Sequence, residues 1–125
     1  MKIGWVRWLV MLPLMLFAAA AAASAQDGEK EVRAFWADAF AAGLKTRVEI
    51  DQLVARVQQA NGNTIIAQVR RRGDSFYLDS AEPFTEDANV EPGLDPLAYL
   101  LEQAHAVGIE VHAWVAVNTI YSGHP

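Results

Sequence analysis

The sequence predicts an α/β protein with parallel strands, and two observations lead to that prediction. Three stretches rich in β-branched and aromatic residues alternate with two segments that show the apolar period of an amphipathic helix. Strands separated by such helices pair in parallel through right-handed crossovers. We therefore expect the order β-α-β-α-β, with strands over residues 32–40, 63–70 and 109–118.

The first helix is predicted from its capping signal. Thr46 and Glu49 have the spacing of a capping box, which satisfies backbone N–H groups of the first turn. An apolar stripe follows, and Asn61-Gly62 ends it. In the strand after this helix, alternate aliphatic residues share the face that is expected to pack under the helices: Ile65, Ala67 and Val69.

The second helix follows a loop over residues 71–94, which is uncommonly long for a segment without function. Asp95 suits the N-cap, Pro96 suits the first helical position, and Gly108 ends the helix. The third strand comes next. Its odd-numbered residues are expected under the helices: Ile109, Val111, Ala113, Val115 and Val117.

The first 25 residues have the pattern of a secretory signal peptide. Lys2 and Arg7 precede an apolar run, and Ala23-Ser24-Ala25 supplies a small-x-small cleavage site. The run is shorter than the ~20 residues that span a bilayer. We therefore expect cleavage after Ala25 and export of residues 26–125 to the periplasm or the cell exterior.

The remaining 26–125 are acidic, with eight Lys or Arg against 15 Asp or Glu and a formal charge of −7. Such a balance does not suit a nucleic-acid backbone, which is bound through cations. The absence of cysteine removes disulfides, thiolate nucleophiles and a lipid attachment site at the cleavage point. We expect no nucleic-acid partner and no stable membrane anchor after cleavage.

Polar and aromatic side chains interrupt the predicted strands near their carboxyl ends, where ligands bind in parallel α/β folds. Along each strand they share one parity, opposite to the aliphatic residues, so they point to one side. Asp74 lies in the loop that continues the second strand. The candidate substrate-binding residues are Trp36, Asp38, Gln68, Arg70, Asp74, His112, Trp114 and Asn118.

This set has the chemistry of a carbohydrate site. Indole faces stack on sugar C–H surfaces, and amide and guanidinium groups hydrogen-bond hydroxyl or acidic groups. A carbohydrate or acidic glycan is therefore the predicted ligand. Structural roles stay open for two of these residues: Trp114 as a core aromatic, and His112 as a histidine bonded to a neighbouring carboxylate or backbone group.

Arg70 is the strongest single candidate, because a guanidinium inside a strand lumen needs a partner. The alternative to a ligand is an internal ion pair with Asp38 or Asp74. Arg71 and Arg72 are expected to be either solvated or anchors of the loop.

No catalytic pair can be assigned within the chain. A glycosidase needs two carboxyl groups, about 5–5.5 Å apart for retention and farther apart for inversion. Asp38 supplies one inward carboxylate, and a second would have to come from Asp74, the long loop or chain beyond Pro125. His105 and His112 match no metal-ligand spacing, so we expect no metal and no cofactor.

A series of short motifs runs through residues 31–123 in a specific order: Arg33-Ala34-Phe35-Trp36, Asn63-Thr64, Gln68-Val69-Arg70, Gly73-Asp74, Asp95-Pro96-Leu97, Ala104-His105 and the run from Gly108 to Trp114. The series resembles the amino-terminal part of the glycosyl hydrolase-like family ten proteins. The resemblance implies a (β/α)₈ barrel of the TIM type, of which residues 26–125 are the first, incomplete portion.

The resemblance also implies an exported glycoside hydrolase that acts on peptidoglycan glycan strands stripped of peptides, or on a related polysaccharide. In related barrels the acid and nucleophile come from the fourth strand onward. We therefore expect the catalytic residues beyond Pro125, and an inactive chain of 125 residues by itself. Asp38 and Asp74 are candidate supporting carboxylates only.

Two positions depart from the family pattern. Ala116 stands where an Asn usually follows the Trp by two residues, with Asn118 as the candidate substitute, and Gly62 stands where a β-branched residue is common. Two other functions stay open beside the enzyme. One is a non-catalytic glycan-binding module that lacks an acid pair, and the other is an inactive fragment.

Overall fold

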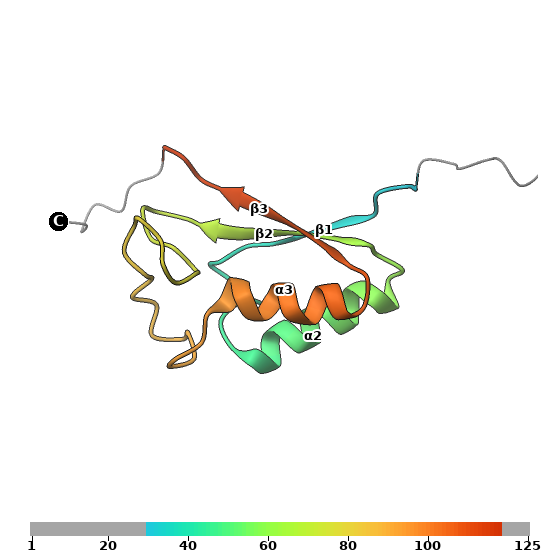
Figure 1. Ribbon diagram of the computed structural model, residues 1–125, viewed down its shortest axis with the longest axis horizontal. Coiled ribbons are helices and arrows are strands. Elements are labelled where there is room, and N and C mark those ends of the chain that lie inside the picture. The colour runs from blue at the N-terminus through green and yellow to red at the C-terminus, as the bar shows by residue number, and fades with distance from the viewer. Residues whose placement is uncertain (1–29, 119–125) are drawn as a thin grey trace, which may run out of the picture. The chain divides into compact units, whose positions relative to one another are not determined.

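The computed structural model describes residues 30–118, in which two helices alternate with three strands. The elements are β1 (Ala34–Ala37), α2 (Arg47–Gln59), β2 (Thr64–Arg70), α3 (Pro96–Ala106) and β3 (Glu110–Val115). The strands lie in the order β1-β2-β3 and pair in parallel (Figure 1). The predicted β-α-β-α-β order and the open, partial sheet are confirmed.

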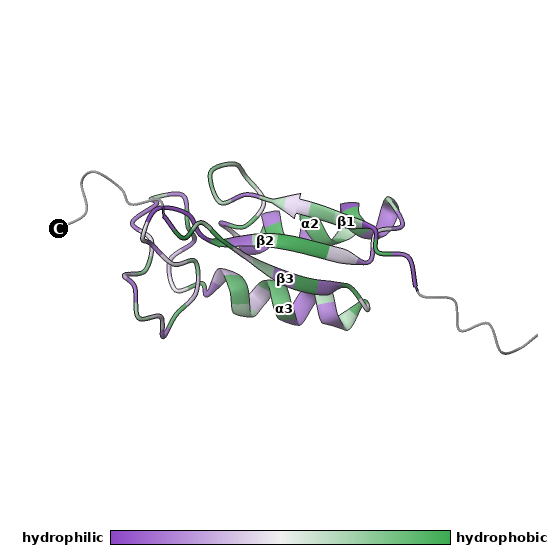
Figure 2. Cartoon of the chain, turned by 90° about the horizontal axis from the view of Figure 1, so that it is seen from above, coloured by the Kyte–Doolittle hydropathy of each residue, from purple (hydrophilic) through white to green (hydrophobic). Residues whose placement is uncertain are grey.

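Both helices lie on the same face of the sheet (Figure 1). The core forms between these two layers. As predicted, Ile65, Ala67 and Val69 of β2 point into it and are 5% exposed or less. Ile50 of α2 and Leu100 of α3 belong to the same apolar cluster. Figure 2 looks onto the opposite, helix-free face, with β2 between β1 and β3.

The two helix starts are capped by the residues that the sequence indicates. Thr46 accepts a hydrogen bond from the backbone N–H of Glu49 at 3.1 Å. The Glu49 carboxylate reaches past the N-cap and accepts from the N–H groups of Gly43 and Lys45, both at 3.0 Å. Asp95 caps α3 and Pro96 opens it. Such caps satisfy N–H groups that have no partner within the helix.

The first strand is shorter than the predicted range 32–40. Asp38 turns the chain directly after β1, because its Oδ1 accepts from the backbone N–H groups of Phe40 and Ala41, both at 2.8 Å. A side chain that bonds its own backbone two or three residues ahead competes with a strand ladder. The ladder with β2 therefore ends where Ala37 lies opposite Ala67.

The third strand is also shorter than the predicted range 109–118. At its start, the N–H of Ile109 donates to the carbonyl of Ala104 and closes the end of α3. At its end, the register with β2 shifts between Gln68 and Arg70. Such an irregularity changes the direction of the side chains that follow it. The two-residue alternation predicted for this stretch therefore holds only as far as the shift.

The predicted burial of the odd-numbered residues of β3 is correct only for the first part of the strand. Ile109 is 3% exposed and Val111 packs on the core. Ala113 is exposed, Val115 is 45% exposed and Val117 is 72% exposed. In the described part of the chain β3 is an edge strand, and its carboxyl half extends beyond the helix-covered core.

The described range 30–118 contains no helix that is long and apolar enough to cross a membrane. The predicted signal peptide, residues 1–25, lies outside the described residues.

Candidate functional site

Two tryptophans meet on the helix-free face of the sheet. The ring centroids of Trp36 on β1 and Trp114 on β3 are 5.2 Å apart, with the planes at 85°. Because β2 lies between their strands and neighbouring strands are about 4.8 Å apart, the rings meet over β2. Trp36 is 66% exposed and Trp114 is partly buried. This tryptophan pair confirms that the two predicted residues share one side of the sheet.

The ladder register identifies the neighbours of the tryptophan pair. Trp36 lies opposite Ile66, which lies opposite His112 on the other side. The imidazole of His112 is exposed, and its Nε2 is 3.6 Å from a carboxylate oxygen of Glu110. Exposed pairs of this kind contribute little to stability. His112 thus has a carboxylate neighbour but stays accessible, and its contact with a ligand stays a prediction.

Gln68 and Asp38 hold the β1–α2 loop, which comprises residues 38–46. Gln68 is 2% exposed, and its Oε1 accepts from the backbone N–H of Ala39 at 3.0 Å. Asp38 caps the N–H groups at the start of the same loop. In this structure both predicted binding residues fix the loop that follows β1. Their contact with a ligand stays a prediction.

Arg70 connects the long loop to the chain beyond β3. Its Nε donates to both carboxylate oxygens of Glu82, at 2.8 and 2.6 Å, and its Nη1 donates to backbone carbonyls of residues 116–117. The sequence predicts either a ligand or an internal ion pair. The ion pair is present, but the prediction of Asp38 or Asp74 as its partner is wrong, because the partner is Glu82. Asp38 instead bonds its own turn, and Asp74 pairs with Arg71.

A buried charge cluster of two cations and two anions lies beneath the loops. The Nε of Arg71 is 3.0 Å from Asp74, and its Nη1 is 3.1 Å from Asp87. The Nζ of Lys45 is 3.0 Å from Asp87. All four side chains are at most 16% exposed. Buried charges are costly unless paired. Arg71 therefore anchors the loop, and its alternative as a solvated residue is wrong.

The charge cluster also binds backbone carbonyls of the β1–α2 loop and a side-chain hydroxyl of the long loop. Lys45 donates to the carbonyl of Phe40 at 2.9 Å, and Arg71 donates to the carbonyl of Ala39 at 3.2 Å. Arg71 also donates to the Thr85 hydroxyl at 3.0 Å. The loop over residues 71–94 has no helix or strand, as expected, but these bonds fix it to the β1–α2 loop.

The pKa values of Asp87 and Asp74 are both lowered. Burial by itself would raise them, but hydrogen bonds and cations outweigh that effect. For Asp87 the contributions come from Asn89 and Lys45, and for Asp74 they include the Thr85 hydroxyl. Both carboxylates are therefore held ionised and engaged. A general acid needs the opposite, a raised pKa near the working pH.

Asn118 lies three residues beyond the end of β3 and is exposed in a turn. The sequence groups it with Trp114 by alternation along one strand. That grouping is wrong, because β3 ends at Val115, after the register shift. Its contact with a ligand stays a prediction.

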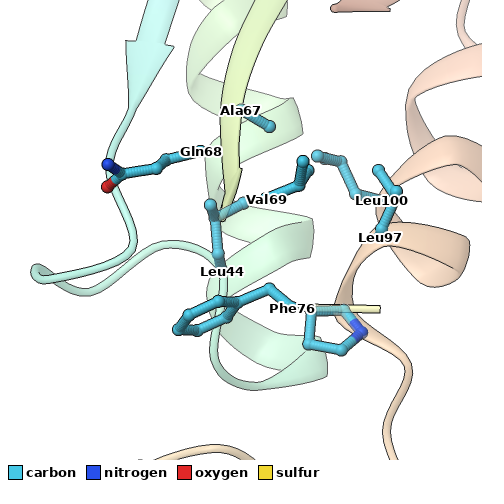
Figure 3. Close-up of a pocket in the computed structure, with 8 residues that line it drawn as sticks. Leu44, Ala67, Gln68, Val69, Phe76, Leu97 and Leu100 are labelled. Carbon is cyan, nitrogen blue, oxygen red and sulfur yellow. The ribbon is translucent and has the colours of Figure 1, made fainter. Parts of the chain in front are cut away.

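A cavity of about 10 Å³ lies in the core rather than on the helix-free face. A void of this size has room for about one water molecule. Gln68 borders it, but in Figure 3 its amide points away from Leu97 and Leu100 toward the chain that follows β1. The other lining residues are apolar: Leu44, Ala67, Val69, Phe76, Pro96, Leu97 and Leu100. The cavity is a packing gap and offers a sugar no room.

The sequence analysis did not identify five residues that make contacts in this region: Phe40, Lys45, Glu82, Asp87 and Glu110. One feature of the sequence could have indicated the acidic ones. The long loop is rich in acids, and acids that fold back on a sheet require cations nearby. The pairing itself depends on the folded path of the loop.

The described residues offer aromatic surface and engaged carboxylates. Asp38, Asp74, Glu82 and Asp87 each accept internal hydrogen bonds. Among residues 30–118, no group of three or more His, Asp or Glu is placed to hold a metal ion.

The alternating parallel strands and helices define a partial β/α unit of a TIM-barrel-like protein. Residues 31–122 match the family described as Glycosyl hydrolase-like 10, and the chain belongs to this family. The family resemblance seen in the motifs is confirmed.

Two curated relatives are similar in sequence to this chain. It is 30% identical over 135 residues to the glycosyl hydrolase YngK of Bacillus subtilis (strain 168), covering 95% of this chain and 26% of that protein. It is 32% identical over 87 residues to the glycosyl hydrolase DigH of Escherichia coli (strain K12), covering 62% of this chain and 20% of that protein. The chain thus spans about a quarter of the first relative and a fifth of the second.

Proposed function

We propose that this chain is the amino-terminal part of an exported glycoside hydrolase that acts on bacterial cell-wall glycan. The tryptophan pair is the observation that carries the proposal. Trp36 and Trp114 meet at 5.2 Å on the face that carries no helix in the described residues. In a closed β/α barrel the helix-free face of the sheet lines the interior, and ligands bind at its carboxyl end. Indole rings are the usual partners of sugar C–H faces.

The proposed substrate is peptidoglycan glycan from which the peptides have been removed. Such strands expose sugar rings for stacking and hydroxyl groups for hydrogen bonds. Exposed His112 beside the tryptophan pair supplies a polar neighbour for them. The signal-peptide pattern of residues 1–25 favours export to the compartment that holds this glycan.

The catalytic carboxyl pair is proposed to come from later strands of the barrel. Two carboxyl groups must flank the scissile bond, one of them protonated. The lowered pKa of Asp74 and the lowered pKa of Asp87 do not favour either residue as the general acid. The role of residues 30–118 is then to bind and orient the glycan.

A non-catalytic glycan-binding module is the second candidate. The engagement of Asp38, Asp74, Glu82 and Asp87 in internal hydrogen bonds favours it, because binding needs no free acid pair. Both candidates use the same aromatic surface, and they differ in whether a bond is cleaved.

The deciding experiment incubates the full-length protein with peptide-free glycan strands and measures both retention on the strands and release of reducing ends. Binding with release supports the hydrolase, and binding without release supports the module. A protein that neither binds nor cleaves the strands contradicts both. Trp36→Ala and Trp114→Ala are expected to lower retention by about tenfold, as the loss of about 1.4 kcal/mol of stacking predicts.

A further inference from the structure

Phe40 is an exposed aromatic residue whose backbone is held on both sides. It lies in the β1–α2 loop and is 54% exposed. Its N–H donates to Asp38 at 2.8 Å, and its carbonyl accepts from Lys45 at 2.9 Å. The side chain of Lys45 is only 8% exposed. A buried cation thus fixes the backbone from which this ring projects.

Two guanidinium groups orient the ring of Phe40. The Cζ of Arg71 is 5.3 Å from the ring centroid, and that of Arg72 is 5.4 Å from it. Cation–π contacts at these distances are attractive. Arg71 is itself immobilised by the charge cluster. The ring is therefore held in place, although more than half of the residue remains accessible.

Phe40 lies just beyond the carboxyl end of β1, the strand that carries Trp36 of the tryptophan pair. Phe40 follows Trp36 by four residues, so their Cα atoms are at most about 14 Å apart. Gln68 of β2 accepts a hydrogen bond from the backbone N–H of Ala39, the residue before Phe40. In the sheet, Gln68 lies opposite Trp114 of β3. A glycan seated on the tryptophan pair has further sugars along its length, and the loop that carries Phe40 lies within their reach.

We propose that Phe40 forms a rim subsite for a second sugar of the same glycan, next to the sugar on the tryptophan pair. The ring supplies apolar contact for a sugar C–H face. The inference rests on the proposed function, because it requires a glycan ligand. It adds a contact that the sequence did not indicate.

Chain-length dependence tests the rim subsite. Peptide-free peptidoglycan fragments of two to eight sugars, separated by length, are titrated into the full-length protein by calorimetry. Phe40→Ala is expected to weaken binding of the longest fragments by about five- to tenfold and to leave the disaccharide unchanged. Trp36→Ala is expected to weaken the binding of fragments of every length.

Three further variants control for structural effects. Phe40→Trp keeps an aromatic face and is expected to retain affinity for long fragments, whereas Phe40→Leu keeps apolar bulk and is expected to lose it. Val107→Ala is the matched control, since Val107 is 42% exposed at the opposite end of the sheet, after α3. Its affinities are expected to equal those of the parent.

The outcomes separate the two proposals. If Phe40→Ala and Phe40→Leu bind the longest fragments as tightly as the parent, the rim subsite is wrong and the proposed function stands. Equal weakening at all lengths also contradicts a separate subsite. If the parent protein binds no fragment of any length, the proposed function fails and the rim subsite fails with it.

Discussion

The two faces of the sheet come from alternate residues of the same strands, yet they differ in what they can do. On the helix-covered face, Ile65 and Val69 are buried under α2 and α3 and are satisfied by packing. On the helix-free face, Trp36 and Trp114 contact each other and keep accessible surface. The comparison concerns where binding is located. Substitutions on the helix-covered face should change the free energy of unfolding alone, whereas substitutions on the helix-free face should also change affinity.

The carboxyl edge adds a third kind of residue to this comparison. The charge cluster is buried like the core but is built from ions, and it fixes the β1–α2 loop, on which Phe40 and Asp38 lie. Substitutions in the charge cluster should therefore change the free energy of unfolding, as substitutions in the apolar core do. The predictions below run from the largest expected effect to the smallest.

Asp87→Ala should have the largest effect on stability. It leaves Lys45 and part of Arg71 buried without their carboxylate, which costs about 3 kcal/mol. Urea unfolding of the full-length protein measures it. Glu86→Ala, at the exposed neighbouring residue, is the control and should stay within about 0.5 kcal/mol of the parent. Equal effects of the two variants would show that the cluster contributes nothing specific.

Lowering the pH should remove the contribution of the charge cluster to the free energy of unfolding. The pKa values of Asp87 and Asp74 are lowered in the folded state, whereas an unfolded Asp titrates at about 3.9. Below about pH 5 the unfolded chain therefore binds more protons than the folded one, and the free energy of unfolding falls as the pH falls. Above that range the contribution is fully present.

Urea titrations between pH 7 and pH 3 measure this slope. In Asp87→Asn one of the responsible carboxyl groups is absent, so the free energy of unfolding should depend less steeply on pH below 5. A variant with the same slope as the parent would contradict the assignment to Asp87.

Gly62→Ala should destabilise the helix-covered side by about 1.5 kcal/mol. A Cβ at Gly62 would lie 2.6 Å from Phe35 and 2.7 Å from Val57, and Val57 is 2% exposed and cannot move aside easily. This explains why a glycine stands at this position. Chemical denaturation measures the loss. The second substitution Phe35→Leu should restore part of the stability, and a Gly62→Ala variant as stable as the parent would refute the clash.

The tryptophan pair should show a small coupling energy. Double-mutant analysis of Trp36→Ala and Trp114→Ala should give about 1 kcal/mol in the free energy of unfolding, as expected for an edge-to-face aromatic pair. Additive effects would mean that the two rings do not interact in solution.

Much of the fold was accessible from the sequence because the determining interactions are local. Thr46 and Asp95 cap helices through residues only three positions ahead. The alternation of Ile65, Ala67 and Val69 follows from strand geometry alone. The shortening of the third strand was not accessible, because it depends on a register shift against another strand.

The candidate site was predictable to a smaller extent. Trp36 and Trp114 were brought together by parity and by the parallel topology, which the sequence indicates. The partner of Arg70 was not, because Glu82 meets it only through the folded path of the long loop. The burial of Gln68 likewise depends on Ala39, which returns over the sheet after the turn at Asp38.

The most direct test of the separation between the two faces compares one conservative variant on each. The dissociation constant for peptide-free glycan and the free energy of unfolding are measured on the full-length protein with Ile65→Val and with Trp36→Ala. Ile65→Val should lose about 1 kcal/mol of stability and keep its affinity, and Trp36→Ala should lose about tenfold in affinity while remaining folded. If Trp36→Ala binds the glycan as tightly as the parent, the assignment of the helix-free face to ligand binding is contradicted.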